Sequence, residues 1–292
     1  MRTTKMTAAL IASMAIFGTI GVVTEYVPLS SAEIALFRAA IAAVLLAGFL
    51  CLSGKGLSFA AVKREWPLLL ISGVALSLNW VLLFEAYRYT TVSVATLSYY
   101  AAPMLVTVLS AVLYRERITW RQAACFVLAT VGLVLMIGVS VDGGSNGRGI
   151  LFGLGAACGY ATVVLLNKRM KELNGIQRSL WQFTVSVPIL FVYVALTDGF
   201  SAHTLSGVGW GCIVLLGVVH TAVAYALYFS AVKVLPGPRV ALLSYLDPLL
   251  AVVLSATVLA EPLSLWQGVG GALILVFTLL SEWSFKRKRA PR

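Results

Sequence analysis

Charged residues are scarce in this chain of 292 residues, of which Asp, Glu, Lys and Arg make up only 11%. A soluble globular domain carries roughly 25%. Hydrophobic residues make up 60%, and a soluble fold of this size has no interior large enough to hide them. Lipid must therefore be the solvent for most of the chain, which excludes an ordinary soluble domain and predicts a membrane protein.

Acidic residues, histidine and cysteine are also few, with 11 acidic against 22 basic residues, two histidines and four cysteines. The cysteines show no CxxC spacing and no cluster with histidine, so neither a metal site nor a disulfide framework is predicted. No loop holds paired catalytic acids or a nucleophile elbow, so we expect neither an enzyme nor a cofactor. The basic residues are scattered between apolar runs, which indicates a membrane and not a nucleic-acid partner.

What the sequence does contain is a series of apolar runs, each near the roughly 20 residues that a helix needs to cross a bilayer. The first run continues to about Val23 and others follow, so we interpret it as an uncleaved helix and not as a signal peptide. The connections are short, which leaves no room for a separate soluble domain. Ten spans are predicted, near residues 6–24, 31–52, 67–87, 92–114, 120–139, 149–167, 179–197, 206–230, 237–259 and 265–284.

The distribution of Lys and Arg gives these spans an orientation. With the N-terminus on the cytoplasmic side, 19 of the 22 basic residues fall in inner segments, whereas only Arg88 and Arg148 fall in outer ones. Arg38 lies within a span. Because cytoplasmic loops are enriched in Lys and Arg, both termini of this multi-pass membrane protein are predicted to be cytoplasmic.

An internal repeat emerges when the sequence is compared with itself at an offset of 145 residues. That offset equals five spans, an odd number, so equivalent helices cross the membrane in opposite directions. The chain then divides into residues 1–145 and 146–292, two inverted five-helix repeats of the kind that secondary transporters use for alternating access. The most informative matches pair Tyr100 with Tyr245, Pro103 with Pro248, Glu116 with Glu261 and Gln122 with Gln267.

Short motifs recur at equivalent places in the two repeats. The second span carries Phe37-Arg38-Ala39-Ala40, the fourth runs from Tyr100-Ala101-Ala102-Pro103 to Glu116, and the ninth from Tyr245-Leu246-Asp247-Pro248 to Glu261. An apolar helix with a central Pro and then a Glu before a short turn, once in each half, resembles the EamA domain of the drug/metabolite transporter superfamily over nearly the whole chain. Within it, the chain looks most like the YddG-type exporters, and this resemblance implies export of aromatic and other neutral amino acids.

Polar and aromatic side chains inside spans are candidates for a solute cavity, because polar groups are costly there and often functional. Asn79 and Trp80 lie in the middle of the third span, and Leu83 follows one turn after Asn79 on the same face. The alternative is that Asn79 holds two helices together while Trp80 faces lipid. The predicted cavity-lining residues are Asn79, Trp80, Leu83, Tyr99, Tyr160, Tyr225, Tyr228 and Ser244.

Proline marks the fourth and ninth spans. Pro103 and Pro248 each remove a backbone donor and are predicted to kink or hinge a helix, one turn after Tyr99 and Ser244, which are equivalent in the repeat. The two halves therefore match in scaffold but differ in side chains, so an asymmetric site is expected. His220, in the eighth span, is interpreted as a neutral, hydrogen-bonded packing residue, with a proton relay as the alternative.

Charged residues within or beside spans are assigned structural roles. Arg38 is expected to pair with an acid on another helix, and Glu85 is a candidate partner. Ser30 and Glu33 have the spacing of a capping box, while Asp247 is a candidate for binding a backbone donor or a cation. Structural roles at helix ends are also predicted for the equivalent residues Glu116 and Glu261.

The predicted cavity indicates a class of solute. Trp and Tyr rings with a few amide and hydroxyl groups suit a neutral, partly apolar molecule, whose ammonium group can contact ring faces. A sugar nucleotide would need several fixed cations, and only Arg38 lies well inside a span. We therefore predict a secondary transporter that exports small neutral amino acids, with a multidrug or other metabolite exporter as the alternative. Its partners are the solute and the bilayer, and one chain with both repeats is consistent with a monomer.

Overall fold

The computed structural model describes residues 2–24, 26–53, 59–89, 95, 98–115, 118–137, 146–258 and 265–287. Regular secondary structure in these residues is entirely helical, which confirms the predicted all-α class. The N-terminal half contains α1 (Arg2–Gly18), α2 (Ile20–Thr24), α3 (Ser31–Leu52), α4 (Phe59–Tyr89), α6 (Ala101–Tyr114) and α7 (Trp120–Ile137). The C-terminal half contains α8 (Asn146–Arg169), α9 (Gly175–Leu196), α10 (Gly207–Gly217), α11 (Ala224–Val232), α12 (Gly237–Leu243), α13 (Leu246–Val258) and α14 (Leu265–Arg287).

Several of these helices are suited to a bilayer. Within the described part of the chain, six helical segments are long and apolar enough to cross a membrane: Thr3–Thr24, Ser31–Leu52, Phe59–Ala86, Gly147–Arg169, Gly175–Leu196 and Gly207–Val232. Shorter apolar helices cover Ala101–Tyr114, Trp120–Leu135 and Gly268–Leu280. The count of ten spans stays a prediction.

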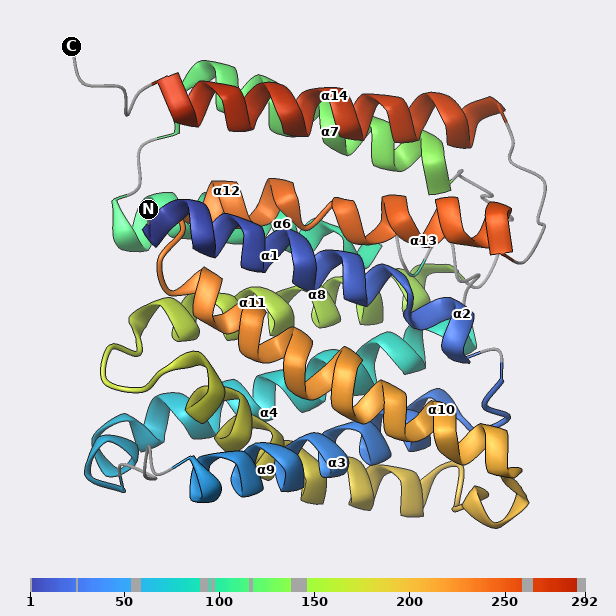
Figure 1. Ribbon diagram of the computed structural model, residues 1–292. Helices are drawn as coiled ribbons and strands as arrows, with labels where there is room; N and C mark the ends of the chain where they lie inside the picture. The colour runs from blue at the N-terminus through green and yellow to red at the C-terminus, as the bar shows by residue number, and fades with distance from the viewer. Residues whose placement is uncertain are drawn as a thin grey trace.

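Helices from the two halves of the chain are interleaved (Figure 1). α4 packs against α8 and α9, α3 packs against α9, and α1 packs against α11 and α13. α7 and α14 pair with each other at one side of the bundle (Figure 1). The main buried apolar cluster joins Leu10 of α1, Leu76 of α4, Phe183 of α9 and Phe229 of α11. The two halves therefore share one core.

Glycine allows the closest of these helix contacts. A Cβ atom at Gly73 of α4 would lie 2.6 Å from the Val185 Cβ of α9, and one at Gly132 of α7 would lie 2.7 Å from the Gly270 carbonyl oxygen of α14. In lipid, helices associate through close packing of small residues, because apolar tails compete equally for apolar side chains. Gly73 thus brings the two halves together beside the core.

Helix breaks occur at the predicted prolines. α12 ends at Leu243 and α13 begins at Leu246, so Pro248 is the third residue of a new helix; Pro103 is likewise the third residue of α6. The N–H groups of a first turn have no partner within the helix, which makes Pro tolerable there. The expectation of a kink inside one continuous helix is therefore corrected for Pro248 to a break before it. The hinge role stays a prediction.

A carboxylate near the start of α4 ties this helix to the chain just before α9. The Glu65 carboxylate accepts hydrogen bonds from the backbone N–H groups of Lys171 (2.5 Å), Glu172 (3.0 Å) and Leu173 (3.3 Å). These bonds lie on the polar turns that extend α4 back to Phe59, before the start predicted near residue 67. The beginning of α1 and the end of α14 lie at this same end of the bundle (Figure 1).

Candidate functional site

A cavity of about 210 Å³ lies between helices of both halves, and we call it the central cavity. Its walls come from α1, α3, α4 and α6 on one side and from α8, α11 and the α12–α13 break on the other. Seven of the eight residues predicted to line a cavity do border it, namely Trp80, Leu83, Tyr99, Tyr160, Tyr225, Tyr228 and Ser244. Their role in binding a solute stays a prediction.

Asn79 takes the alternative position that the sequence left open. Its side chain is 2% exposed, and its amide Nδ2 donates to the Ala156 carbonyl oxygen of α8 at 2.8 Å. Gly159 makes this contact possible, because a Cβ atom there would lie 3.0 Å from the Ala75 carbonyl oxygen and 3.1 Å from the Asn79 Cβ. Asn79 therefore connects α4 to α8 and does not border the central cavity.

The equivalent tyrosines of the repeat have different surroundings. Tyr100 borders the central cavity. Tyr245 is fully buried away from it, stacked on Phe126 at 5.9 Å between ring centroids and sharing a 2.8 Å hydrogen bond with the Thr130 hydroxyl. The two halves thus present different side chains at equivalent positions of the repeat, as the equivalent pair Tyr99 and Ser244 indicated.

An aromatic wall surrounds Tyr225. Its ring centroid lies 5.0 Å from that of Phe17 and 6.2 Å from that of Trp80, both in edge-on contacts. The Tyr160 and Tyr228 hydroxyls hydrogen-bond to each other beside it. Edge-on aromatic packing is favourable beyond the area it buries, so the rings form a firm apolar surface with hydroxyl groups at one part of it.

Arg38 borders the central cavity and does not form the predicted pair with Glu85. Its Nε donates to the Thr221 hydroxyl at 3.0 Å, and its Cζ lies 6.0 Å from the Trp80 ring centroid. Glu85 instead accepts from Arg88, one turn later on the same helix, and from Tyr193. Arg88 lies on the same helix as Glu85 and forms the ion pair with it. Arg38 therefore has no ion pair with Glu85 and borders the cavity.

Asp247 is the second charged residue of the central cavity. It occupies the first turn of α13, and its backbone N–H donates to the Ser244 carbonyl oxygen at 3.2 Å. Sequence reasoning considered both Asp247 and Arg38 but did not place them in one cavity. The sequence feature that pointed to both residues was their charge within predicted spans, because a charged side chain in the membrane costs free energy and is often functional.

A π-helix shapes the wall that supports Arg38. Residues Val218–Val223 form it between α10 and α11. The Thr221 hydroxyl donates to the Leu216 carbonyl oxygen, five residues earlier, at 2.9 Å. His220 is buried, with Nε2 sharing a 2.7 Å hydrogen bond with the Thr19 hydroxyl, which agrees with its interpretation as a hydrogen-bonded packing residue. Such π-helical turns are frequent at functional sites.

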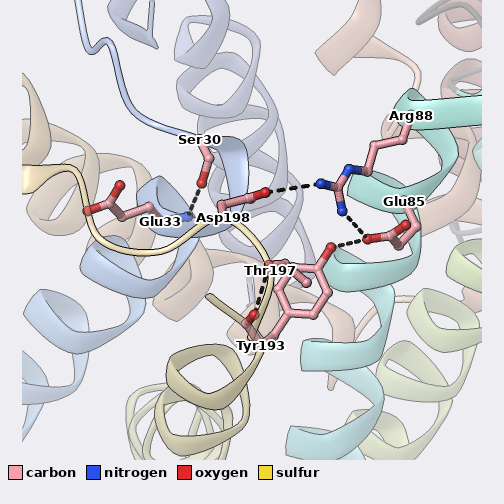
Figure 2. A network of polar contacts seen from close by, with 7 residues as sticks. All are labelled: Ser30, Glu33, Glu85, Arg88, Tyr193, Thr197 and Asp198. Carbon is pink, nitrogen blue, oxygen red and sulfur yellow. Dashed lines mark hydrogen bonds and ion pairs between the residues drawn. The ribbon is translucent and has the colours of Figure 1, made fainter. Parts of the chain in front are cut away.

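Figure 2 shows a polar network where α4 and α9 end, away from the central cavity. Arg88 forms ion pairs with Glu85 (3.0 Å) and Asp198 (3.2 Å), and Tyr193 donates to Glu85. The hydrogen bond from Arg88 to Glu85, together with both negative charges, raises the pKa of Arg88. This network joins the end of α4, which the Lys and Arg distribution predicts to lie on the outer side, to the C-terminal half.

Beside this network, the predicted capping box is only half formed. The Ser30 hydroxyl accepts from the Glu33 backbone N–H at 3.2 Å, as expected for a helix cap (Figure 2). The Glu33 carboxylate does not turn back to Ser30 but accepts from the backbone N–H groups of Ser201 and Ala202, both at 2.9 Å. Those two N–H groups belong to the connection between α9 and α10, where the backbone has no helical partner for them. Glu33 thus links the two halves instead of closing its own cap.

A larger hollow of about 540 Å³ lies between α6, α7 and α12. Its lining is almost entirely apolar, with Thr107, Gln122 and Thr130 as the polar exceptions. The central cavity is the stronger candidate for a solute site, because aromatic, hydroxyl and charged groups converge there. The predicted structural residues Glu116 and Glu261 lie outside the described residues.

An all-helical bundle with bilayer-length helices around a polar, aromatic cavity is an arrangement that suits a membrane transporter. The sequence profile of the EamA-like transporter family matches residues 4–138 and again residues 147–283. The chain belongs to this family, whose members are transporters, and it is a multi-pass inner membrane protein. The resemblance found in the sequence is therefore confirmed at the level of the family.

Individual relatives agree with this assignment. The chain is 30% identical over 273 residues to "Uncharacterized transporter YxxF" of Bacillus subtilis, covering 92% of this chain and 86% of the relative. It is 26% identical over 265 residues to "Probable amino-acid metabolite efflux pump" of Salmonella typhimurium, covering 85% and 88%. A solved crystal structure with 18% sequence identity superposes with a TM-score of 0.85 over 94% of this chain and 96% of the other, which shows a shared fold.

Proposed function

We propose that the chain is a secondary transporter that exports small neutral amino acids, aromatic ones included, across the inner membrane. The observation that carries the proposal is the composition of the central cavity, where the rings of Trp80, Tyr99, Tyr225 and Tyr228 surround one small space. Ring surfaces bury apolar side chains and attract an ammonium group. The Salmonella relative named as a probable amino-acid metabolite efflux pump supports the same class of solute, as does the resemblance to YddG-type exporters.

The size of the cavity favours a metabolite over a drug. Pockets for drug-sized ligands span roughly 300–1,000 Å³, whereas the central cavity measures about 210 Å³. The larger hollow between α6, α7 and α12 has room for a bulkier apolar molecule, and it is the one observation that favours the alternative of a multidrug exporter.

The proposed mechanism is alternating access between two inverted repeats, residues 1–145 and 146–292. Three observations support it. The family profile matches the chain twice, in stretches of similar length; α6 and α13 begin at Ala101 and Leu246, positions separated by the repeat offset of 145; and both halves supply walls of the central cavity. The start of α1 and the end of α14 share one end of the bundle (Figure 1), as an even number of crossings requires.

Purified protein in liposomes tests the function directly. Uptake of labelled phenylalanine, methionine and threonine is measured beside uptake of a cationic dye, with empty liposomes as the control. We expect saturable amino-acid uptake, with phenylalanine carried best because the wall is aromatic, and little movement of the dye.

Dye uptake in the absence of amino-acid uptake contradicts the proposal and favours the multidrug alternative. Uptake that rises linearly with concentration up to the solubility limit contradicts a carrier with a binding site.

A further inference from the structure

Two opposite charges border the central cavity from different halves of the chain. The Arg38 guanidinium comes from α3, and the Asp247 carboxylate comes from the first turn of α13. Among the residues that the structure describes, the ion pairs lie elsewhere, at the two ends of α4. Arg38 and Asp247 therefore face one small space without pairing with each other.

Arg38 is held so that part of its guanidinium remains available. Its Nε donates to the Thr221 hydroxyl at 3.0 Å, and the Trp80 ring lies beside it at 6.0 Å. No described residue supplies a hydrogen-bond acceptor to its two terminal amino groups, and neither group is sealed from the cavity. A planar guanidinium presents paired N–H donors that match the two oxygens of a carboxylate.

The backbone of Asp247 is fixed by close packing, while its side chain borders the cavity. α1 packs against it so closely that a Cβ atom at Gly18 would lie 3.0 Å from the Asp247 carbonyl oxygen. Within the described part of the chain, the Asp247 carboxylate receives no hydrogen bond. A carboxylate removed from bulk water is costly unless a cation or several donors compensate it, so a cation is expected against it when the cavity is filled.

Tyr225 places the aromatic wall beside both charges. It borders the central cavity together with Arg38 and Asp247, and its ring contacts Phe17 and Trp80. A free α-amino acid carries a carboxylate and an ammonium group on one carbon, with the side chain next to both. The cavity has this arrangement in complementary form, with a cation, an anion and an apolar wall.

We propose, resting on the transport function proposed above, that the central cavity binds its amino acid as the zwitterion. The substrate carboxylate pairs with Arg38, the substrate ammonium group pairs with Asp247, and both charges are required for transport. Because α3 and α13 belong to different halves, a bound zwitterion bridges the two repeats.

The first test uses the wild-type protein in liposomes. Uptake of labelled phenylalanine is challenged with excess unlabelled phenylalanine, with phenethylamine, which lacks the carboxylate, or with 3-phenylpropionate, which lacks the ammonium group. Charge-assisted contacts each contribute enough that losing one weakens binding roughly tenfold or more. We therefore expect both analogues to inhibit at least roughly tenfold less well than phenylalanine.

The possible outcomes separate this inference from the proposed function. If phenylalanine is carried but either analogue competes as well as phenylalanine, recognition of the zwitterion is wrong and amino-acid transport still stands. If the wild-type protein carries no amino acid, the proposed function itself is wrong.

Substitutions provide the second test. We expect Arg38→Gln and Asp247→Asn each to reduce the affinity for phenylalanine roughly tenfold or more. Arg38→Lys keeps the positive charge and is expected to retain more affinity than Arg38→Gln. The matched controls are Arg64→Gln and Glu172→Gln, which remove an exposed ion pair outside the cavity and are expected to transport normally. Full affinity in correctly folded Arg38→Gln or Asp247→Asn protein would overturn the assignment.

Discussion

Tyr225 and its neighbours show how far single residues could be assigned from the sequence. Aromatic side chains are conspicuous in an apolar span, and Trp80, Tyr99, Tyr225 and Tyr228 all border the central cavity. Asn79 was ambiguous because an amide in a span serves a cavity and a helix contact equally well, and only the packing of Gly159 against α4 decides between them.

The charged residues were harder to place for a physical reason. α3 is apolar around its whole circumference, because one face meets lipid and the other meets protein, and both are apolar. The sequence of α3 therefore does not indicate which way Arg38 points, and distance along the chain says nothing of its separation from Asp247. The predicted ion pair between Arg38 and Glu85 was wrong, because the Glu85 carboxylate already interacts with Arg88 and Tyr193.

At the residue scale, we predict that Trp80→Ala and Tyr99→Ala impair phenylalanine uptake. Truncating an aromatic residue at the centre of a binding site typically costs more than about 1.4 kcal/mol, which corresponds to roughly a tenfold loss of affinity. The measurement is concentration-dependent uptake into liposomes, with retention on a sizing column as the check for folded protein.

Trp120→Ala and Tyr26→Ala remove rings of the same types from exposed positions outside the cavity, and uptake is expected to be unchanged. If Trp80→Ala and Tyr99→Ala both transport like these controls, the central cavity is not the binding site.

Among the elements, the π-helix at Val218–Val223 was beyond reach from the sequence. An apolar run predicts a helix but not its type. The wider π-helical turn, in which hydrogen bonds join residues five apart, depends on contacts with neighbouring helices. The break between α12 and α13 was signalled by Pro248, although a kink and a break have the same sequence signature. The ends of α4 also followed tertiary contacts, since Glu65 binds backbone groups of the segment before α9.

The π-helix leads to a prediction about Thr221. Replacing it by Val keeps the shape but removes the acceptor for the Arg38 Nε. Hydrogen bonds to charged groups contribute about 1.5–3 kcal/mol, so Thr221→Val should lower phenylalanine affinity and thermal stability. Thr221→Ser retains the hydroxyl and should behave nearly as the wild-type protein. Equal behaviour of Val and Ser at this position argues against a supporting role for the hydroxyl.

Helix contacts give a second prediction at this scale. Gly73→Ala places a Cβ atom 2.6 Å from the Val185 Cβ, and overpacking of this kind costs about 1–3 kcal/mol. Gly211→Ala introduces the same methyl group into open space and should be neutral or stabilising by up to about 1 kcal/mol. Thermal unfolding in detergent should therefore occur at a lower temperature for Gly73→Ala only. Equal melting of the two variants contradicts the close packing of α4 on α9.

For the whole molecule, composition and periodicity were informative because lipid imposes simple requirements. Apolar runs predicted helices over the regions where α1 with α2, α3, α4, α8, α9 and the stretch from α10 to α11 provide segments long and apolar enough to span. The reason is that backbone groups in lipid must be satisfied within the helix. How the helices interleave was not predictable, because the two halves contact each other through small residues and isolated polar groups.

Orientation is the next prediction for the whole molecule. The Lys and Arg distribution predicts that both termini lie in the cytoplasm. A green fluorescent protein fused after Arg292 should fluoresce in cells, and alkaline phosphatase fused at the same place should be inactive. Active phosphatase at that position contradicts the predicted topology and the even number of crossings.

The central claim is that one cavity between two halves holds the solute and opens in turn to each side of the membrane. Leu83 lines that cavity and tolerates a small change, so Leu83→Cys is introduced after Cys51, Cys125, Cys158 and Cys212 are replaced by Ala. A membrane-impermeant maleimide is then added to right-side-out or inside-out vesicles. We predict labelling of Cys at this position from either side, slowed in both cases by phenylalanine. Labelling from one side only, or labelling that phenylalanine leaves unchanged, would contradict the account.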